Sequence, residues 1–437
     1  MSAKNKANMC KPDNPTRLTT NHTAGCISRK NVITAAIHFD LTWMPRVSPD
    51  PCASVADLKS QSEQARRLDE EIAGKIKSQG SGILKLVEDF NAEFGAVTPA
   101  QSASANLPRW RWSWFGDFDM TAMAMGAQAP TWDARNCCFW PSRQKALSWV
   151  KSVSDVNRIS IPKWSEEPAF QQMLESRQRW YKAFPDNPPG SLGGASWNQP
   201  AGREPVKFLS YMSFIDMGPH LFGADEFMMI LAGDAQLADA LMEKFFELST
   251  SYSEFMQALQ GGKVGCIVGF GGDYACMLSP DLYQKYSVAW DQKLFDYFRK
   301  FYAAPQDAPC NLHSCGPSSH LYSHWGTHPL RSNITTMQTR LLSEHVKSLR
   351  LNLPETLLQL TFHPEHFDFA NVGPDDVRAV LRQAVEDVNG SNAEFVVFAF
   401  ANDPQDIERL ETNLHVMYDE MDEINSCCMS GIDAAHI

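Results

Sequence analysis

The feature that most constrains the fold is an alternation, after about residue 200, of short strand-like runs with amphipathic helical patterns. Each run is apolar or nearly so and is followed by turn residues, which is typical of a buried strand. Strand-like runs occur at 206–215, 263–270, 308–313, 357–362 and 394–400. Buried strands that alternate with helices pair in parallel, so the pattern predicts an α/β protein with a parallel sheet.

The helical segments between these runs carry start signals. Ser279 is a predicted N-cap with Pro280 at the first helical position, and Pro374 and Pro404 open two later helices. A long helix is expected at about 234–260. Before residue 200 we expect an amphipathic helix in 54–78 and a helical piece near 117–126.

Two arrangements of parallel strands compete, a (β/α)8 barrel and an open doubly wound sheet. No Gly-x-Gly-x-x-Gly follows the first strand, which disfavours a dinucleotide-binding open sheet. We therefore predict a single (β/α)8 barrel with a helical N-terminal elaboration. The expected organisation is a flexible tail at 1–29, a barrel domain at 30–425 and a C-terminal tail at 426–437. Within the domain, 30–200 wraps the main barrel and supplies its first strand, and 200–425 forms the rest.

Composition limits the partners and the compartment. The net charge of −12 disfavours nucleic acid and anionic membranes as partners, and no apolar run approaches the ~18 residues of a membrane span. The 11 cysteines are irregularly spaced and several lie in apolar runs, which favours a reduced, cytoplasmic enzyme over a disulfide scaffold. The first residues lack the apolar segment of a secretory signal. The oligomeric state stays open.

Polar side chains with catalytic or metal-binding chemistry follow the predicted strands. Because the carboxyl ends of barrel strands meet at one mouth, residues distant in sequence can share a site there. The expected cluster is Asp273, His313 with Cys315, and His363, with Asn402 and Asp403 after the last strand. Asp403 is better explained as a helix cap. Asp273 is either a site residue or a solvated loop residue.

The segment "NLHSCGPSSH" at 311–320 is the candidate metal-binding motif. Zinc prefers nitrogen and sulfur ligands, and the turn at Gly316-Pro317 could aim His313 and Cys315 together into a barrel mouth. The alternative is a buried cysteine beside a hydrogen-bonded histidine. His320, His324 and His328 recur at a four-residue spacing, which indicates either a packing face or a second metal or substrate contact.

Several segments resemble the uroporphyrinogen decarboxylase superfamily, and within it the cobamide-dependent methyltransferases. The resemblance covers about 29–425 and implies a single (β/α)8 barrel. "HSCGPSSHL" resembles the His-x-Cys-Gly segment that supplies zinc ligands in the methyltransferases. The other matching segments are "RKNVITAAIHFD", which resembles the family's opening helix, "SVSDVNRISIP", "FIDMGPHLFGADEFMMILAGDAQLADALMEKF" and "GGDYACMLSPDLYQKY".

The sequence also departs from the family. The methyltransferases carry a further zinc-binding cysteine at the last strand end, where this chain reads "FVVFAFANDP". The decarboxylases carry substrate-binding arginines in an Arg-Gln-Ala-Gly-Arg stretch, where this chain reads "TWMPRVSPD". His363 or Asp273 would therefore have to complete a zinc site, and His363 is the better ligand beside sulfur.

Three functions follow from the resemblance. The first is methyl transfer between a corrinoid and a small thiol or methylated substrate at a zinc site. Its cobamide would arrive on a corrinoid protein or free, because no Asp-x-His-x-x-Gly corrinoid-binding segment is present. The second is a metal-free decarboxylase or related lyase, in which Asp273 stabilises a protonated intermediate and an arginine such as Arg46 holds the carboxylates. The third is a non-catalytic binding protein. The sequence does not identify substrate-binding residues.

Overall fold

The computed structural model describes the greater part of residues 117–433, and before them two short segments and one single residue. The described ranges are 34–41, 54–60, 63, 117–127, 131–133, 138–140, 145–183, 207–259, 266–301, 306–314, 316–340, 343–362, 371–388, 392–401 and 406–433.

Seven strands form one parallel sheet. Their order across the sheet is β1 (Thr34–Leu41), β9 (Ala393–Ala401), β8 (Leu357–Phe362), β7 (Ile334–Arg340), β6 (Cys310–Ser314), β5 (Cys266–Gly271) and β4 (Lys207–Met212). The strands from β4 to β9 therefore lie side by side in chain order, and β1 pairs with β9. The expected parallel α/β sheet is confirmed. β1 and β4 are its two edges within the described residues, so closure into an eight-stranded barrel stays a prediction.

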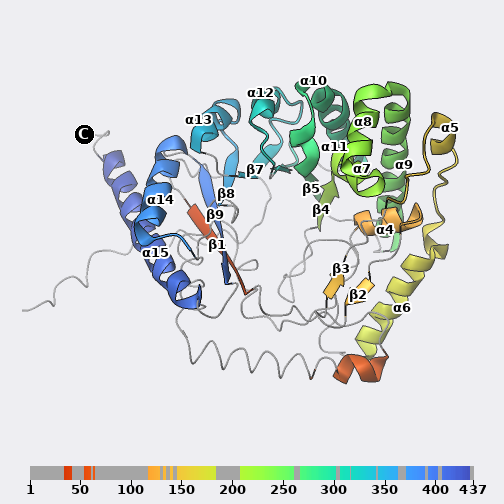
Figure 1. The fold of residues 1–437 in the computed structure, drawn as a ribbon, viewed down its shortest axis with the longest axis horizontal. Coiled ribbons are helices and arrows are strands. Elements are labelled where there is room, and N and C mark those ends of the chain that lie inside the picture. The colour runs from red at the N-terminus through yellow and green to blue at the C-terminus, as the bar shows by residue number, and fades with distance from the viewer. Residues whose placement is uncertain are drawn as a thin grey trace, which may run out of the picture.

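Helices connect successive strands and lie along one side of the sheet, where Figure 1 shows them as an arc outside the strands. They are α7 (Phe214–Phe222), α8 (Ala224–Gly233) and α9 (Ala235–Leu259) after β4; α10 (Pro280–Tyr283), a π-helical turn (Gln284–Val288) and α11 (Ala289–Phe301) after β5; then α12 (Tyr322–Gly326), α13 (Ser343–Asn352), α14 (Pro374–Val388) and α15 (Asp406–Asp433). The N-terminal part contains α4 (Asp117–Ala124), α5 (Val153–Val156), α6 (Pro168–Ala183) and an antiparallel pair, β2 (Thr131–Asp133) with β3 (Cys138–Trp140).

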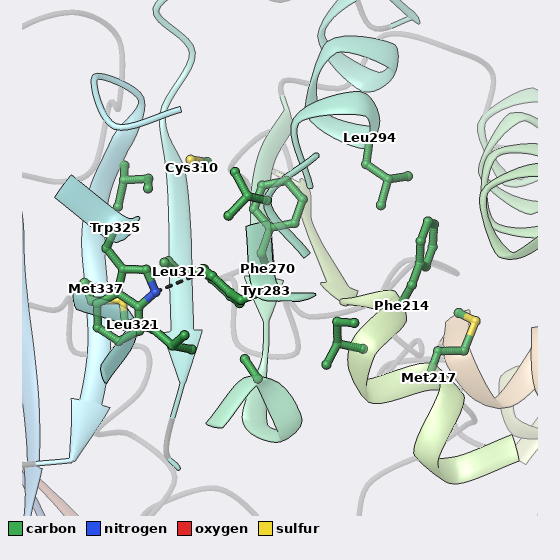
Figure 2. Packing of buried hydrophobic residues seen from close by; sticks show 14 of the residues in the cluster. Phe214, Met217, Phe270, Tyr283, Leu294, Cys310, Leu312, Leu321, Trp325 and Met337 are labelled. Carbon is green, nitrogen blue, oxygen red and sulfur yellow. Dashed lines mark hydrogen bonds between the residues drawn. The ribbon is translucent and has the colours of Figure 1, made fainter. Parts of the chain in front are cut away.

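Burial alternates along the central strands and so distinguishes the two faces of the sheet. Cys310 and Leu312 in β6 and Met337 in β7 are buried, whereas His313 and Gln338 are only partly buried. Because side chains alternate along a strand, the first three share one face and the other two share the opposite face. Figure 2 shows Cys310, Leu312 and Met337 in the apolar packing with Trp325 and Leu321. The opposite face carries the polar residues.

Most predicted elements are present near their expected positions. The long helix at about 234–260 is α9, and the strand at 357–362 is β8 with the same bounds. The side chain of Ser279 accepts a hydrogen bond from Leu282 N–H, as expected of an N-cap. The helix α15 continues to Asp433, beyond the predicted boundary at 425.

Two assignments were wrong. The segment "RKNVITAAIHFD" contains the strand β1 rather than an opening helix, because eight consecutive residues pair in parallel with β9. The strand expected at 206–215 ends at Met212, and Phe214 already begins α7. A short apolar run does not reveal by itself where a buried strand gives way to a buried helix.

Gly218 in α7 allows α7 and α8 to pack closely. A Cβ built at Gly218 would lie 2.2 Å from two ring atoms of Phe227, a residue that is fully buried. In an exposed helix, glycine to alanine raises stability by about 1 kcal/mol. Here the added methyl would overlap a ring that has no free space to move into.

We therefore expect Gly218→Ala to lower the free energy of unfolding by about 1–3 kcal/mol, the range for overpacked cores. Urea denaturation followed by circular dichroism measures this change. Gly233→Ala in α8 is the matched control, because a Cβ there meets no atom within 4 Å. It should leave stability unchanged or raise it slightly. If Gly218→Ala is as stable as the parent chain, Gly218 and Phe227 do not pack as closely as described here.

Candidate functional site

The carboxyl ends of β5 and β6 bring Asp273 and His313 together. The strand β5 ends at Gly271, and the N–H of Gly272 donates to the carbonyl of His313 at 2.8 Å. This bond holds the chain against β6 for one more residue. Asp273 then begins a 3-10 turn, Asp273–Met277, at the end of the sheet where a parallel α/β fold places its chemistry.

The imidazole of His313 lies between a carboxylate and an amide. Asp273 Oδ1 is 3.0 Å from His313 Nε2, and Gln338 Oε1 is 2.8 Å from His313 Nδ1. Which ring nitrogen carries the hydrogen depends on the tautomer. Where the Gln338 oxygen accepts from Nδ1–H, Nε2 of the neutral ring and the Asp273 carboxylate both present lone pairs, and a proton or a metal cation between them makes the contact favourable. Where the Gln338 amide nitrogen donates to Nδ1, Nε2–H itself donates to Asp273.

Asp216 in α7 positions the Asp273 turn. Its carboxylate oxygens accept hydrogen bonds from Asp273 N–H at 3.0 Å and Tyr274 N–H at 2.8 Å. Only 5% of Asp216 is exposed. Burial raises the pKa of this carboxyl to about 7, while the two backbone hydrogen bonds act to lower it. The start of the turn is thus bound to α7 as well as to β6.

The turn after β6 packs directly on the Asp273 turn. A Cβ built at Gly316 would lie 2.5 Å from Cys276 Sγ and 2.9 Å from the carbonyl oxygen of Asp273. The Sγ of Cys276 in turn lies 3.2 Å from that same carbonyl. Glycine is needed at position 316 because a larger residue would displace backbone atoms next to the Asp273 side chain.

A second buried carboxylate lies behind the His313 pair. Asp291 in α11 is 2% exposed and accepts a hydrogen bond from Ser287 Oγ at 3.2 Å. Burial raises its pKa to about 7, and the charge of Asp216 adds to this shift. Asp291 and His313 both line a small cavity of about 10 Å³. Its other polar lining residues are Ser213, Ser287 and Ser314. It is large enough for one water molecule.

Buried aromatic side chains form the apolar side of that cavity. Trp325 Nε1 donates a hydrogen bond to the Tyr283 hydroxyl at 2.9 Å, the dashed line in Figure 2. Both side chains are almost fully buried. Their rings, with Phe270 and Leu312, complete the wall of the cavity. Ionisation of Asp291 therefore takes place next to apolar surface, which explains its raised pKa.

A row of polar side chains continues from His313 across the sheet. The parallel register places His313, Gln338, Gln359 and Glu394 directly opposite one another on β6, β7, β8 and β9. Gln359 Nε2 donates to Glu394 Oε2 at 2.6 Å, and Glu394 is fully buried. The row therefore begins at the partly exposed Asp273–His313 pair and ends at a buried carboxylate.

The sequence-based site is only partly covered by the described residues. Asp273 and His313 are brought together, with 48% and 36% of their side chains exposed. Cys315 and His363 lie outside the described residues, as do Asn402, Asp403 and Arg46. Within the described ranges no group of three or more His, Cys, Asp or Glu side chains is arranged to hold a metal.

Two residues of the site fit a zinc ion as ligands. Two tetrahedral ligands that each lie 2.0–2.1 Å from zinc are separated from each other by about 3.3 Å. The 3.0 Å between His313 Nε2 and Asp273 Oδ1 is close to this separation. Because Gln338 contacts Nδ1, Nε2 is the ring nitrogen that faces Asp273 and could bind the metal. A zinc-binding histidine usually has a hydrogen-bond partner on its other ring nitrogen.

The three histidines at four-residue spacing have structural contacts. His320 Nε2 bonds to the carbonyl of Leu278 at 2.9 Å, and His324 packs edge-on against Tyr283. His328 is 4% exposed and its Nδ1 accepts the N–H of Leu330 at 3.0 Å. Burial lowers the pKa of His328 to about 4. These contacts favour the packing explanation over a second metal site.

Sequence reasoning missed the strand β7 and with it Gln338 and Arg340. Thr336, Gln338 and Arg340 alternate in "ITTMQTR" and are all partly exposed. Period-two alternation of polar residues was the available signal for a strand with one polar face. Asp216 and Glu394 had no comparable signal, because their roles arise from contacts with other elements.

Raised carboxyl pKa values have a direct consequence for stability. The folded chain holds the Asp291 proton up to about pH 7, whereas the unfolded chain releases it near 3.8. The stabilisation is complete below about pH 4 and is lost as pH rises to about 7. At about 1.4 kcal/mol per pKa unit, the loss is at most about 4 kcal/mol.

We expect Asp291→Asn to become more stable relative to the parent chain as pH rises from 4 to 8, because the amide never ionises. Urea unfolding at pH 4, 5, 6, 7 and 8 measures the difference in unfolding free energy. Asp387→Asn is the control and should show no such gain. Asp387 is a buried carboxylate on α14, and it pairs with Lys347 on α13. Parallel stability curves for Asp291→Asn and the parent chain would show that folding does not raise the pKa of Asp291.

No described helix is long and apolar enough to cross a bilayer. No family model matches the sequence, and no curated protein matches it. Among solved structures, a methyltransferase from Methanosarcina mazei is similar at 12% sequence identity and a TM-score of 0.41, over 87% of this chain and 95% of that chain. At this level the likeness assigns neither a family nor an activity.

Proposed function

We propose that this chain is an enzyme that moves a methyl group between a corrinoid and a small thiol or methylated substrate, at a zinc site on the carboxyl ends of β5 and β6. The proposal joins the His-x-Cys-Gly resemblance of 313–316 to the arrangement of the described residues. The observation that carries it is the 3.0 Å contact between His313 Nε2 and Asp273 Oδ1, because an imidazole nitrogen and a carboxylate oxygen at this separation can share one metal ion as ligands.

The proposed ligands are His313, Cys315 and Asp273. The short contact with His313 favours Asp273 as the third ligand in place of the family's missing cysteine, and His363 is the alternative. Bound zinc lowers the pKa of a thiol, so that the nucleophilic thiolate exists at neutral pH. An aspartate ligand adds negative charge and would make the zinc a weaker Lewis acid than a further histidine would.

The protein's own residues prepare this site before any ligand binds. Gln338 bonds to His313 Nδ1 and fixes the orientation of the ring, and Asp216 holds the backbone of the Asp273 turn. The half-exposed pair can be reached from solvent, whereas Asp216 and Asp291 behind it are buried. We propose that the corrinoid arrives on a partner protein or free, and that the parallel sheet closes into an eight-stranded barrel.

The metal-free lyase is the second candidate, and the same contact gives it support. A proton shared between Asp273 and His313 would make the pair a general acid that substrate can reach. Arg340 ends β7 on the same face as Gln338 and could hold a substrate carboxylate there. Zinc content separates the two candidates, because only the methyltransferase needs the metal.

The decisive experiment measures zinc in protein purified without a histidine tag. We expect about one zinc per chain, and we expect Cys315→Ser, His313→Gln and Asp273→Asn each to lower zinc affinity at least tenfold. Cys310→Ala is the matched cysteine control, because Cys310 is buried on the opposite face of β6 and burial raises its pKa to about 12. It should keep full zinc content.

The same zinc measurement has outcomes that would contradict the proposal. A folded parent chain that binds no zinc at micromolar concentration would exclude zinc-assisted methyl transfer and favour the lyase. Zinc binding that survives Asp273→Asn but not His363→Gln would assign the third ligand to His363. Circular dichroism of each variant establishes that the loss of metal is not a loss of fold.

A further inference from the structure

The small cavity beside the Asp273 turn contains a polar group that no protein atom satisfies. Every residue that lines this cavity is buried except His313, which is partly exposed. The hydroxyl of Ser213, a residue that is 1% exposed, is part of the lining and has no hydrogen-bond partner among the described residues. Because a buried hydroxyl without a hydrogen bond costs free energy, Ser213 indicates a partner from outside the protein.

The other serine hydroxyls of the lining already have protein partners. Ser314 Oγ lies 2.8 Å from Ser318 Oγ, and Ser287 Oγ donates to Asp291 Oδ2 at 3.2 Å. Within the described part of the chain, the bond from Ser287 leaves the second carboxyl oxygen of Asp291 for another donor. The polar side of the cavity therefore offers Ser213 Oγ and one oxygen of Asp291 to a small ligand.

The side chain of Ser213 faces the cavity although another role was available to it. Ser213 is the N-cap of α7, where a serine side chain usually accepts a backbone N–H. Its carbonyl accepts the N–H of Asp216 and of Met217, both at 2.9 Å, but its side chain makes no capping bond. A Cβ built at Gly272, which also lines the cavity, would lie 3.9 Å from Ser213 Oγ. The hydroxyl thus lies beside the space next to Gly272.

We propose that this cavity binds one ordered water molecule, which bonds to Ser213 Oγ and to the carboxyl of Asp291. The cavity volume of about 10 Å³ is what a single water molecule needs. Cavities that stay dry in proteins are apolar, whereas buried polar groups without protein partners usually bind water. Water both donates and accepts hydrogen bonds, so it suits the Asp291 carboxyl whether or not that group is ionised.

The water molecule would support the functional site from the interior. It would join the start of α7 to α11, and α7 carries Asp216, whose carboxylate accepts the N–H of Asp273. Gly272 directly precedes Asp273 and lines the same cavity. The bound water would thus hold the Asp273 turn from behind. This inference does not depend on the proposed function, because it involves neither zinc nor a substrate.

The first test fills the cavity in the full-length chain. A Cβ at Gly272 meets only ordinary contacts, the nearest at 3.6 Å from Ala275, so Gly272→Ala should fold and place its methyl group where the water would lie. Magnetic relaxation dispersion of 17O-labelled solvent counts internal water molecules that exchange slowly. We expect about one fewer in Gly272→Ala than in the parent chain. Gly233→Ala, where a Cβ meets no atom within 4 Å, is the control and should leave the count unchanged.

An unchanged count in a folded Gly272→Ala overturns the proposal. Circular dichroism establishes that the variant is folded.

A second test uses the sign of a stability change, measured by urea unfolding. With water bound, Ser213→Ala removes a hydrogen bond and should raise the unfolding equilibrium constant about threefold to tenfold. If the hydroxyl has no partner, its removal should lower that constant, which would overturn the proposal even if Gly272→Ala does not fold. In the Gly272→Ala background, where the methyl group excludes water, Ser213→Ala should no longer raise the constant.

Ser253→Ala is the control for removal of a buried serine hydroxyl. Ser253 Oγ donates to the carbonyl of Ser249 at 2.8 Å within α9, so the effect of this substitution should be the same with and without Gly272→Ala.

The alternative occupant is a small cation, which a change of salt distinguishes from water. Replacement of Na⁺ and K⁺ by choline at constant ionic strength should alter the stability of the parent chain and of Ser213→Ala equally. A loss of stability in choline that occurs in the parent chain but not in Ser213→Ala would identify a bound cation and overturn the proposal.

Discussion

The site depends on the parallel register of β5, β6 and β7. This register places Gly271, His313 and Gln338 in one row, and the absence of a side chain at Gly271 leaves one side of the imidazole open. Asp273 reaches that side from the turn after β5, while Gln338 occupies the other side. A shift of one residue in β6 would turn His313 to the helix-covered face and place Leu312 in the row instead.

The second requirement is that the turns after the strands are held in place from several directions. Asp216 binds the first amides of the Asp273 turn, Gly272 bonds to β6, and Gly316 lets the next turn approach within contact distance. Each contact joins a different element to the Asp273 turn. Such support limits the motion of a half-exposed side chain, which a metal or proton-transfer site requires.

The buried carboxylates connect this site to the interior. Burial raises the pKa of both Asp216 and Asp291 to about 7, and the charge of Asp216 raises the pKa of Asp291 further. Glu394 lies on the other side of His313 along the polar row. The pair of Asp273 and His313 is thus placed among acidic groups, an environment that favours a bound cation or proton. This electrostatic character is a property of the assembled sheet and α-helices.

Local sequence patterns predict the alternation of strands and helices, the helix starts at Pro280 and Pro374, and the position of Asp273 and His313 after or near strand ends. These features follow from periodicity and capping, which depend on neighbours in the chain. Three features emerge only in the folded chain: "RKNVITAAIHFD" contains a strand, "ITTMQTR" is β7, and Asp216 and Gln338 contact the site. Those outcomes depend on pairing and burial between distant segments, which no local pattern records.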